Sequence, residues 1–234
     1  MSHTVADALG MLQFLEAVVE QARGAAAPTV RPVWARDLLL ARNPPRPSFA
    51  HREYDEVPLD DPIALLADEL VQGFVFFGPR DVAAIRDRLA PGLRERSSTT
   101  FDVLTAFLWK CRTMALQLPD ADEEVRLRFT VCACHGKRGL RLPRGYYGNT
   151  VVLAVAVSTA GQLRANPVGY AVELVRKAKA EVDAEYIQSM ADLMVLRGRP
   201  QFRMYQFAHT MQGRGRHRRP DMVTWPPMDR FTEE

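Results

Sequence analysis

Apolar residues recur at steps of three and four along the first part of the chain, which places them on one face of a helix. This stripe comprises Ala8, Met11, Leu12, Leu15, Val18, Val19 and Ala22. Asp7 directly precedes the stripe, where a carboxylate can accept hydrogen bonds from free backbone N–H groups and meet the positive end of the helix dipole. Gly24 follows it, as is typical of helix ends. We therefore expect a helix from Ala8 to Ala22 that Asp7 caps.

Prolines interrupt the pattern between residues 25 and 62, so we expect an irregular crossover there, attached to a surface by Trp34 and Tyr54. Beyond it, strand-like and helix-like segments alternate. We expect strands at 71–78, 125–133 and 149–158, and helices at 81–90, 99–116 and 169–195, the last broken near Ala184. Such alternation is typical of an α/β or α+β fold with a mixed sheet.

The composition is that of a folded globular domain, with 47% hydrophobic residues. No apolar run reaches the roughly 18 residues of a membrane helix, and no secretory leader is visible. The three cysteines, Cys111, Cys132 and Cys134, lack the spacing of metal ligands. We therefore expect reduced thiols, no bound metal and a cytoplasmic protein.

The net charge of +3 is concentrated in one place, because residues 214–219 contain four arginines. The excess base is a local feature, so it does not indicate nucleic-acid binding by the whole chain. It leaves open one interpretation from another functional class, a small interaction protein whose basic tail contacts nucleic acid or acidic partners.

Three His-x-x-x-Asp pairs occur, His3 with Asp7, His51 with Asp55 and His217 with Asp221. Composition alone predicts about 0.3 such pairs, so the spacing by itself identifies no site. We interpret the pair of His217, which lies in the arginine-rich tail, as incidental. His51 lies in the proline-rich crossover, where a surface histidine with an ordinary loop hydrogen bond is expected. His3 differs, because small residues surround it and an apolar helix follows it.

The segment from His3 reads HTVADALGMLQFLEAVVEQARG, and five further segments follow in order: HREYDEVP, FFGP, STTFDVLTAFLWKCRT, LPRGYYGN and YIQSMADLMVLRGRP. Together they resemble the plant BAHD acyltransferases, whose active-site segment reads HTxxDAxG before an apolar helix. The likeness spans about residues 3 to 202 and is closest to the alcohol acyltransferase branch that includes benzyl alcohol benzoyltransferases. Collinear segments are far more specific than one five-residue pair, which favours His3 over the other histidines.

The resemblance implies an enzyme that transfers an acyl group from acyl-coenzyme A to an alcohol and forms an ester. It implies His3 as the general base and Asp7 as a structural residue, with no metal and no permanently bound cofactor. Acyl-coenzyme A is then a co-substrate and a small-molecule alcohol the acceptor, with no membrane and no nucleic acid expected as partners. The implied substrate channel includes Gly10, Tyr146, Tyr147, Gly148 and Asn149.

The resemblance also implies a chloramphenicol acetyltransferase-like mixed sheet flanked by helices, mostly the second of two BAHD domains. We expect a remnant of the first domain at 1–24, a crossover linker at 25–65, the second acyltransferase domain at 66–202 and a divergent, disordered tail at 203–234. Only two residues precede His3, and the DFGWG motif expected after RGRP is absent, so we expect truncation at both ends.

Truncation leaves two interpretations open. The chain is either an acyltransferase or a non-catalytic remnant of the same family that binds coenzyme A or a partner chain. A sheet that has lost its other half exposes apolar surface, so we expect either a monomer or self-association through that surface.

Overall fold

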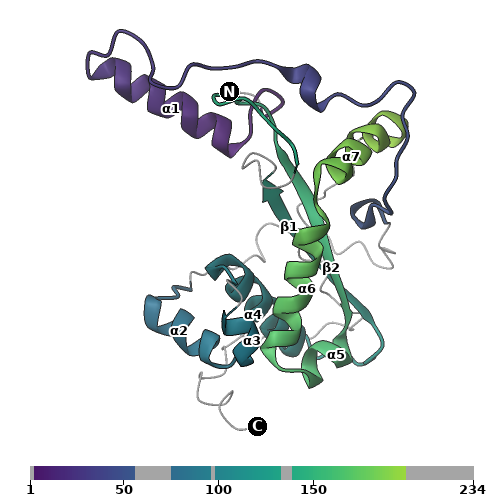
Figure 1. Ribbon diagram of the computed structural model, residues 1–234. Helices are drawn as coiled ribbons and strands as arrows, with labels where there is room; N and C mark the ends of the chain where they lie inside the picture. Colours follow the sequence, from purple (N-terminus) through teal and green to yellow (C-terminus); the bar gives the residue numbers. More distant parts are fainter. Residues whose placement is uncertain (1–2, 56–74, 96–97, 133–138, 199–234) are drawn as a thin grey trace, which may run out of the picture. The chain divides into compact units, whose positions relative to one another are not determined.

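The computed structural model of the chain describes residues 3–55, 75–95, 98–132 and 139–198 (Figure 1). These residues fall into two compact units. The first unit contains the described residues of 1–57, 127–156 and 173–203, and the second contains those of 58–126 and 157–172. The domain division expected from the sequence stays a prediction, and its last part, 203–234, lies outside the described residues.

Helix α1 spans Ala8–Ala22, as predicted, with Asp7 as its N-cap. Its last turn is followed by Gly24, whose φ of +93° is a left-handed conformation that glycine adopts without strain. Large apolar side chains of α1 face water, including four of the predicted stripe: between 42% and 51% of the surface is accessible in Leu9, Leu12, Phe14, Leu15, Val18 and Val19. Exposed apolar surface is therefore present on this helix, and the predicted exposure of a sheet face stays a prediction.

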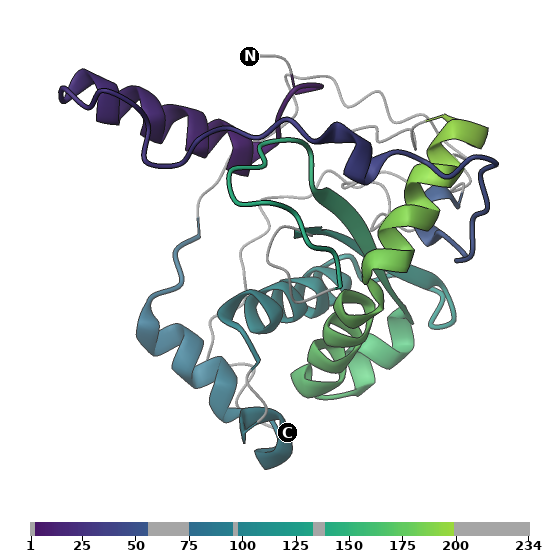
Figure 2. The same ribbon diagram turned by 45° about the horizontal axis from the view of Figure 1, so that its top comes forward.

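The crossover is irregular, as predicted, and contains two short 3-10 helices, η1 (Arg36–Leu39) and η2 (Arg52–Tyr54). Helix α7, Ala184–Arg197, contacts η1, and both views show them close together (Figures 1 and 2). The Tyr54 hydroxyl donates a hydrogen bond of 3.0 Å to the Gly198 carbonyl. This contact is the attachment that the sequence predicted for Tyr54.

Two strands, β1 (Glu124–Cys132) and β2 (Val151–Thr159), form the sheet of the described residues. They are antiparallel, because Glu123 is hydrogen-bonded to Ala160 at one end and Cys132 lies against Thr150 at the other. An isolated parallel bridge joins Val33 to Tyr146, so both kinds of pairing occur. Alternate side chains of β1 are buried, as expected for a strand with one face in a core: Val125, Leu127, Phe129 and Val131.

The strand predicted at 71–78 is not found. Residues 71–74 lie outside the described residues, and residues 75–78 form no strand. Val75 and Phe76 are 60% and 90% exposed, so these two apolar side chains do not pack into a core. Aromatic residues favour strands only where a pleated surface is available to pack them.

The second unit is mainly helical, with α2 (Pro79–Asp87), α3 (Pro91–Glu95), α4 (Thr100–Ala115) and α5 (Ala160–Ala165). Helix α4 contacts both α2 and α5 (Figures 1 and 2). Thr99 caps α4, since its side chain accepts a hydrogen bond from the Asp102 backbone N–H. Trp109 of α4 is 1% exposed and forms part of the core.

The long helix predicted at 169–195 is two helices, α6 (Val168–Glu181) and α7. The break lies at the predicted place, because Asp183 accepts a hydrogen bond of 2.8 Å from the Tyr186 backbone N–H and caps α7. No helix of the described residues is both long enough and apolar enough to cross a membrane.

The cysteines differ from the expectation of three reduced thiols. Cys111 is free and buried, and burial raises the pKa of its thiol to about 11. Cys132 is disulfide-bonded, so the expectation is wrong for this residue. Cysteine spacing in a sequence does not report oxidation state. Cys134 lies outside the described residues, as do His217 and Asp221.

Candidate active site

Asp7 joins the start of α1 to the start of β2. Its Oδ1 accepts hydrogen bonds of 3.0 Å from the backbone N–H groups of Leu9 and Gly10. Its Oδ2 accepts bonds of 2.9 and 3.0 Å from the backbone N–H and the hydroxyl of Thr150. The residue is only 4% exposed. Four protein donors therefore occupy this buried carboxylate, which makes it an anchor for the chain around it.

The His3 segment, residues 3–7, is held at further points along its backbone. The side-chain amide of Asn149 donates to the His3 carbonyl at 2.9 Å and lies 3.4 Å from the Thr4 carbonyl. The Arg36 guanidinium donates from Nη2 to the Val5 carbonyl at 2.8 Å. His3 itself is exposed. The surrounding structure thus fixes the backbone of the segment and leaves the histidine at the surface.

An aromatic cluster of Trp34, Tyr146 and Tyr147 surrounds the Arg36 guanidinium. The guanidinium carbon lies 4.4 Å from the Trp34 ring centroid, 4.7 Å from that of Tyr147 and 5.4 Å from that of Tyr146. A cation over aromatic faces at such distances is attracted by their quadrupoles. The cluster therefore places the guanidinium, and with it the donor to Val5, in one position.

Gly10 lies where α1 approaches the loop before β2 most closely. It is buried, and a Cβ at this position would lie 2.1 Å from the Tyr147 carbonyl oxygen. No larger residue fits without moving one of the two backbones. Gly145, with φ of +92°, is constrained similarly, since a Cβ there would lie 2.0 Å from the Arg31 carbonyl oxygen. The two glycines permit the contacts that bring residues 146–150 against the His3 segment.

The residues predicted for the site come together within the first unit. The N-terminal group of His3, Asp7 and Gly10 contacts the segment of Tyr146, Tyr147, Gly148 and Asn149. Roles in a substrate channel stay a prediction for these residues.

Sequence reasoning missed Thr150, which directly follows the quoted YYGN motif, and Arg36, which no motif marked. A buried carboxylate needs donors, so the search for partners of Asp7 could have found Thr150.

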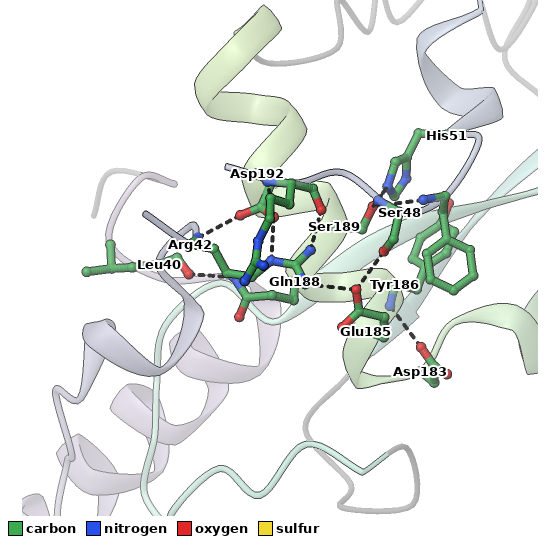
Figure 3. Close-up of polar contacts among 12 residues, drawn as sticks. Leu40, Arg42, Ser48, His51, Asp183, Glu185, Tyr186, Gln188, Ser189 and Asp192 are labelled. Carbon is green, nitrogen blue, oxygen red and sulfur yellow. Dashed lines mark hydrogen bonds and ion pairs between the residues drawn. The ribbon is translucent and has the colours of Figure 1, made fainter. Parts of the chain in front are cut away.

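His51, by contrast, is not the surface residue that the sequence predicted. It is 5% exposed, and its Nε2 lies 2.8 Å from Ser189 Oγ of α7 (Figure 3). Its Nδ1 lies 3.0 Å from Glu53 Oε1. The expectation is wrong because the partner that buries His51 is 138 residues away along the chain.

The Ser189–His51–Glu53 contacts have the geometry of a hydrolase triad, but their hydrogen bonds are those of a structural network. Ser189 Oγ accepts the backbone N–H groups of Ser48 at 2.8 Å and Phe49 at 3.1 Å. Its hydrogen is therefore directed to His51 Nε2, and the other ring nitrogen donates to Glu53. Ser189 is 0% exposed, so its oxygen has neither a free lone pair nor access to a substrate.

Tyr186 completes this network on the other side of Glu53. Its hydroxyl donates to the two carboxylate oxygens of Glu53 at 2.8 and 3.0 Å. Burial, the Glu53 charge and the hydrogen bond to Glu53 raise the pKa of the Tyr186 phenol above its ordinary value. The phenol therefore stays protonated and acts as a fixed donor.

The strap, residues 40–55, is attached to α7 at a second buried group, Asp192 (Figure 3). Asp192 is 0% exposed and accepts bonds from the Arg42 backbone N–H and Nε, both at 2.6 Å, and from the Arg46 backbone N–H at 2.9 Å. Burial alone raises the pKa of Asp192, but the hydrogen bonds from Arg46 and Arg42 outweigh it and leave the pKa below its ordinary value. The Asp192 carboxylate is therefore charged at neutral pH.

Among the residues that the structure describes, no group of three His, Cys, Asp or Glu side chains could hold a metal ion. The His3 segment instead combines an exposed imidazole with a rigidly attached backbone. This arrangement suits the transfer of a proton to or from a molecule that approaches the surface.

Comparison with known proteins assigns the chain to a family. The model of the Transferase family matches residues 1–216, so the chain belongs to this family, the BAHD acyltransferases. Among curated relatives, the benzyl alcohol O-benzoyltransferase of Nicotiana tabacum is 50% identical over 204 residues, covering 86% of this chain and 43% of the relative. The alcohol acyl transferase 1 allele RGb of Malus domestica is 47% identical over 205 residues, with 86% and 45% covered. The chain thus spans less than half the length of these relatives.

A solved structure supports the fold. The structure of F. graminearum TRI101 complexed with coenzyme A and deoxynivalenol matches 89% of this chain and 46% of that chain, with a TM-score of 0.52 and 14% identity. The predicted fold class is confirmed: the chain has a chloramphenicol acetyltransferase-like α+β fold of helices around a small sheet.

Proposed function

We propose that the protein to which this chain belongs transfers an acyl group from acyl-coenzyme A to an alcohol, with His3 as the general base. The single observation that supports the role of His3 is the anchoring of its segment. Asp7 is buried under four hydrogen bonds while His3, four residues earlier, is exposed. Family membership and relatives that are named alcohol acyltransferases support the reaction class.

The chemistry requires one base and no covalent enzyme intermediate. His3 takes the proton of the acceptor hydroxyl while the alcohol oxygen attacks the thioester carbonyl carbon. The carbon–sulfur bond then breaks, and the imidazolium returns the proton to the departing coenzyme A thiolate. The products are an ester and free coenzyme A, and Asp7 holds the segment without touching the substrates.

The remaining elements of the proposal follow from the same site. Gly10 and residues 146–149 line the path by which substrates reach His3. Acyl-coenzyme A is a co-substrate, no cofactor is bound permanently, and the reaction takes place in the cytoplasm. The assembly state, monomer or self-associated, stays a prediction.

An ester-forming assay of the full chain tests the proposal. Benzoyl- and acetyl-coenzyme A are offered with benzyl or aliphatic alcohols, and ester is measured by mass spectrometry. His3→Ala should reduce the rate at least about a hundredfold, the lower range for loss of a general base. The fold should survive, because the contact of Asn149 is made to the His3 backbone carbonyl, which alanine retains.

Asp55→Ala is the matched control, since Asp55 is the exposed aspartate of the second His-x-x-x-Asp pair. It should leave the rate unchanged. Ester formation that persists in His3→Ala would contradict the assignment of His3 as the base.

A second candidate is a non-catalytic member of the family that binds coenzyme A or a partner chain. The exposure of His3 favours it, because general acid–base catalysis gains from a site that excludes water. Calorimetric binding of coenzyme A by the unaltered chain without any ester formation would support this candidate over the first.

A further inference from the structure

Arg36 contacts the His3 segment at its centre. Its Nη2 donates to the carbonyl of Val5, at 2.8 Å, and Val5 lies midway between His3 and Asp7. Asn149 holds the His3 end of the segment and Thr150 holds Asp7. The bond from Arg36 therefore restrains the segment at Val5, between these two attachments.

The aromatic cluster restricts the Arg36 side chain in turn. Its guanidinium carbon lies within 5.4 Å of all three ring centroids, those of Trp34, Tyr146 and Tyr147. The Trp34 and Tyr147 rings are themselves 6.1 Å apart and tilted by 59°. A planar guanidinium can lie on aromatic faces and still direct an N–H group to a carbonyl, which the ammonium of lysine does less well.

The backbone before Arg36 is strained in a way that serves this arrangement. Ala35 has φ of +26° and ψ of 45°, in the left-handed region that residues other than glycine rarely adopt. This conformation turns the chain between Trp34 and Arg36 so that the guanidinium lies over the Trp34 ring. Strained residues persist where surrounding contacts hold them, and they concentrate at functional sites.

We propose that Arg36 is a positioning residue that fixes His3 for acyl transfer, an inference that rests on the function proposed above. Arg36 acts through the Val5 carbonyl and touches neither substrate. Without it, the Val5 carbonyl loses its donor, and the segment between His3 and Asp7 is held less firmly. A displacement of the base by about 1 Å is enough to reduce turnover about a hundredfold.

The test compares Arg36→Ala and Arg36→Lys with Arg31→Ala in the full chain. Arg31 is an exposed arginine of the same crossover and serves as the charge-matched control. The first readout is the NMR backbone order parameter at Thr4, Val5 and Ala6. It should fall below about 0.6 in Arg36→Ala, hold an intermediate value in Arg36→Lys and stay unchanged in Arg31→Ala.

The second readout separates positioning from substrate binding. Arg36→Ala should lower kcat about a hundredfold with little change in KM, and Arg36→Lys should recover part of the loss. Circular dichroism confirms that each variant is folded, and Arg36→Lys supplies the comparison if Arg36→Ala does not fold.

Unchanged order parameters in both Arg36 variants would overturn the proposal, as would lowered order parameters with unchanged kcat. Failure of the proposed function gives a different result. In that case the unaltered chain forms no ester, while the order parameters still decide whether Arg36 fixes the His3 segment.

Discussion

The two His-x-x-x-Asp pairs of the first unit have the same spacing and opposite environments. In the first pair His3 is exposed and Asp7 is 4% exposed, whereas in the second His51 is 5% exposed and Asp55 faces the solvent. The side chain of the buried member of each pair is hydrogen-bonded to a residue from a distant part of the chain, Thr150 for Asp7 and Ser189 for His51. Spacing therefore does not assign a role to a histidine, and the group that is left exposed is the one available for chemistry.

The largest expected difference between the two pairs is in stability. His51→Ala removes a buried ring, leaves Ser189 and Glu53 without their shared partner and should lower the free energy of unfolding by about 3–4 kcal/mol. His3→Ala removes an exposed side chain and should change it by less than about 0.5 kcal/mol. Urea denaturation followed by circular dichroism measures both values. Equal losses in the two variants would show that the environments are not opposite.

The aspartates should show the reverse order, with a somewhat smaller effect. Asp7→Ala removes the cap of α1 and leaves the two Thr150 donors without an acceptor. The free energy of unfolding should fall by about 2–3 kcal/mol. Asp55→Ala removes an exposed side chain that forms an ion pair of 3.5 Å with Arg52, which should cost less than about 0.5 kcal/mol. The same denaturation experiment applies. A loss of stability in Asp55→Ala as large as that in Asp7→Ala would show that the two aspartates do not differ in environment.

The smallest expected effect is acid loosening of the strap. The pKa of Asp192 lies below its ordinary value, as does that of Glu185, which accepts hydrogen bonds from Ser48 and Arg42. A lowered carboxyl pKa contributes stability above the unfolded value of about 4, and this contribution is lost as the pH falls through the folded pKa. The strap should therefore stay attached at neutral pH and loosen only below about pH 4.

NMR can follow this loosening at the backbone N–H groups of Arg42 and Arg46, which donate to Asp192. Their signals should keep their positions down to about pH 4 and shift at lower pH. Asp192→Asn retains an acceptor oxygen without the titrating charge, so its signals should not show this shift. A shift that begins near neutral pH in the unaltered chain would contradict the lowered pKa.

Features that depend on neighbouring residues could be predicted from the sequence. The periodicity of α1, its cap Asp7, the two strands and the break before Ala184 all follow from interactions within a few residues. A structural role for Asp7 was likewise expected. The local sequence pattern predicts its N-cap hydrogen bonds but not its bonds to Thr150.

Features that depend on distant residues could not be predicted. The burial of His51 depends on Ser189, and the position of the Val5 carbonyl depends on Arg36, 31 residues away. The exposure of the α1 stripe could not be predicted either, because periodicity shows which residues share a face but not what covers that face. Tertiary contacts decide these properties, and no motif in the chain records them.

The close approach of Gly10 to the Tyr147 carbonyl has a consequence for mutational tolerance. Every replacement at this position adds a Cβ, whereas the neighbouring Leu9 and Leu12 are exposed and accept polar residues without loss of packing. In a saturation library of α1, position 10 should be depleted of all substitutions while the flanking positions remain diverse. The close approach at Gly10 would therefore show as an invariant column among apolar residues that look, from their sequence, far more important.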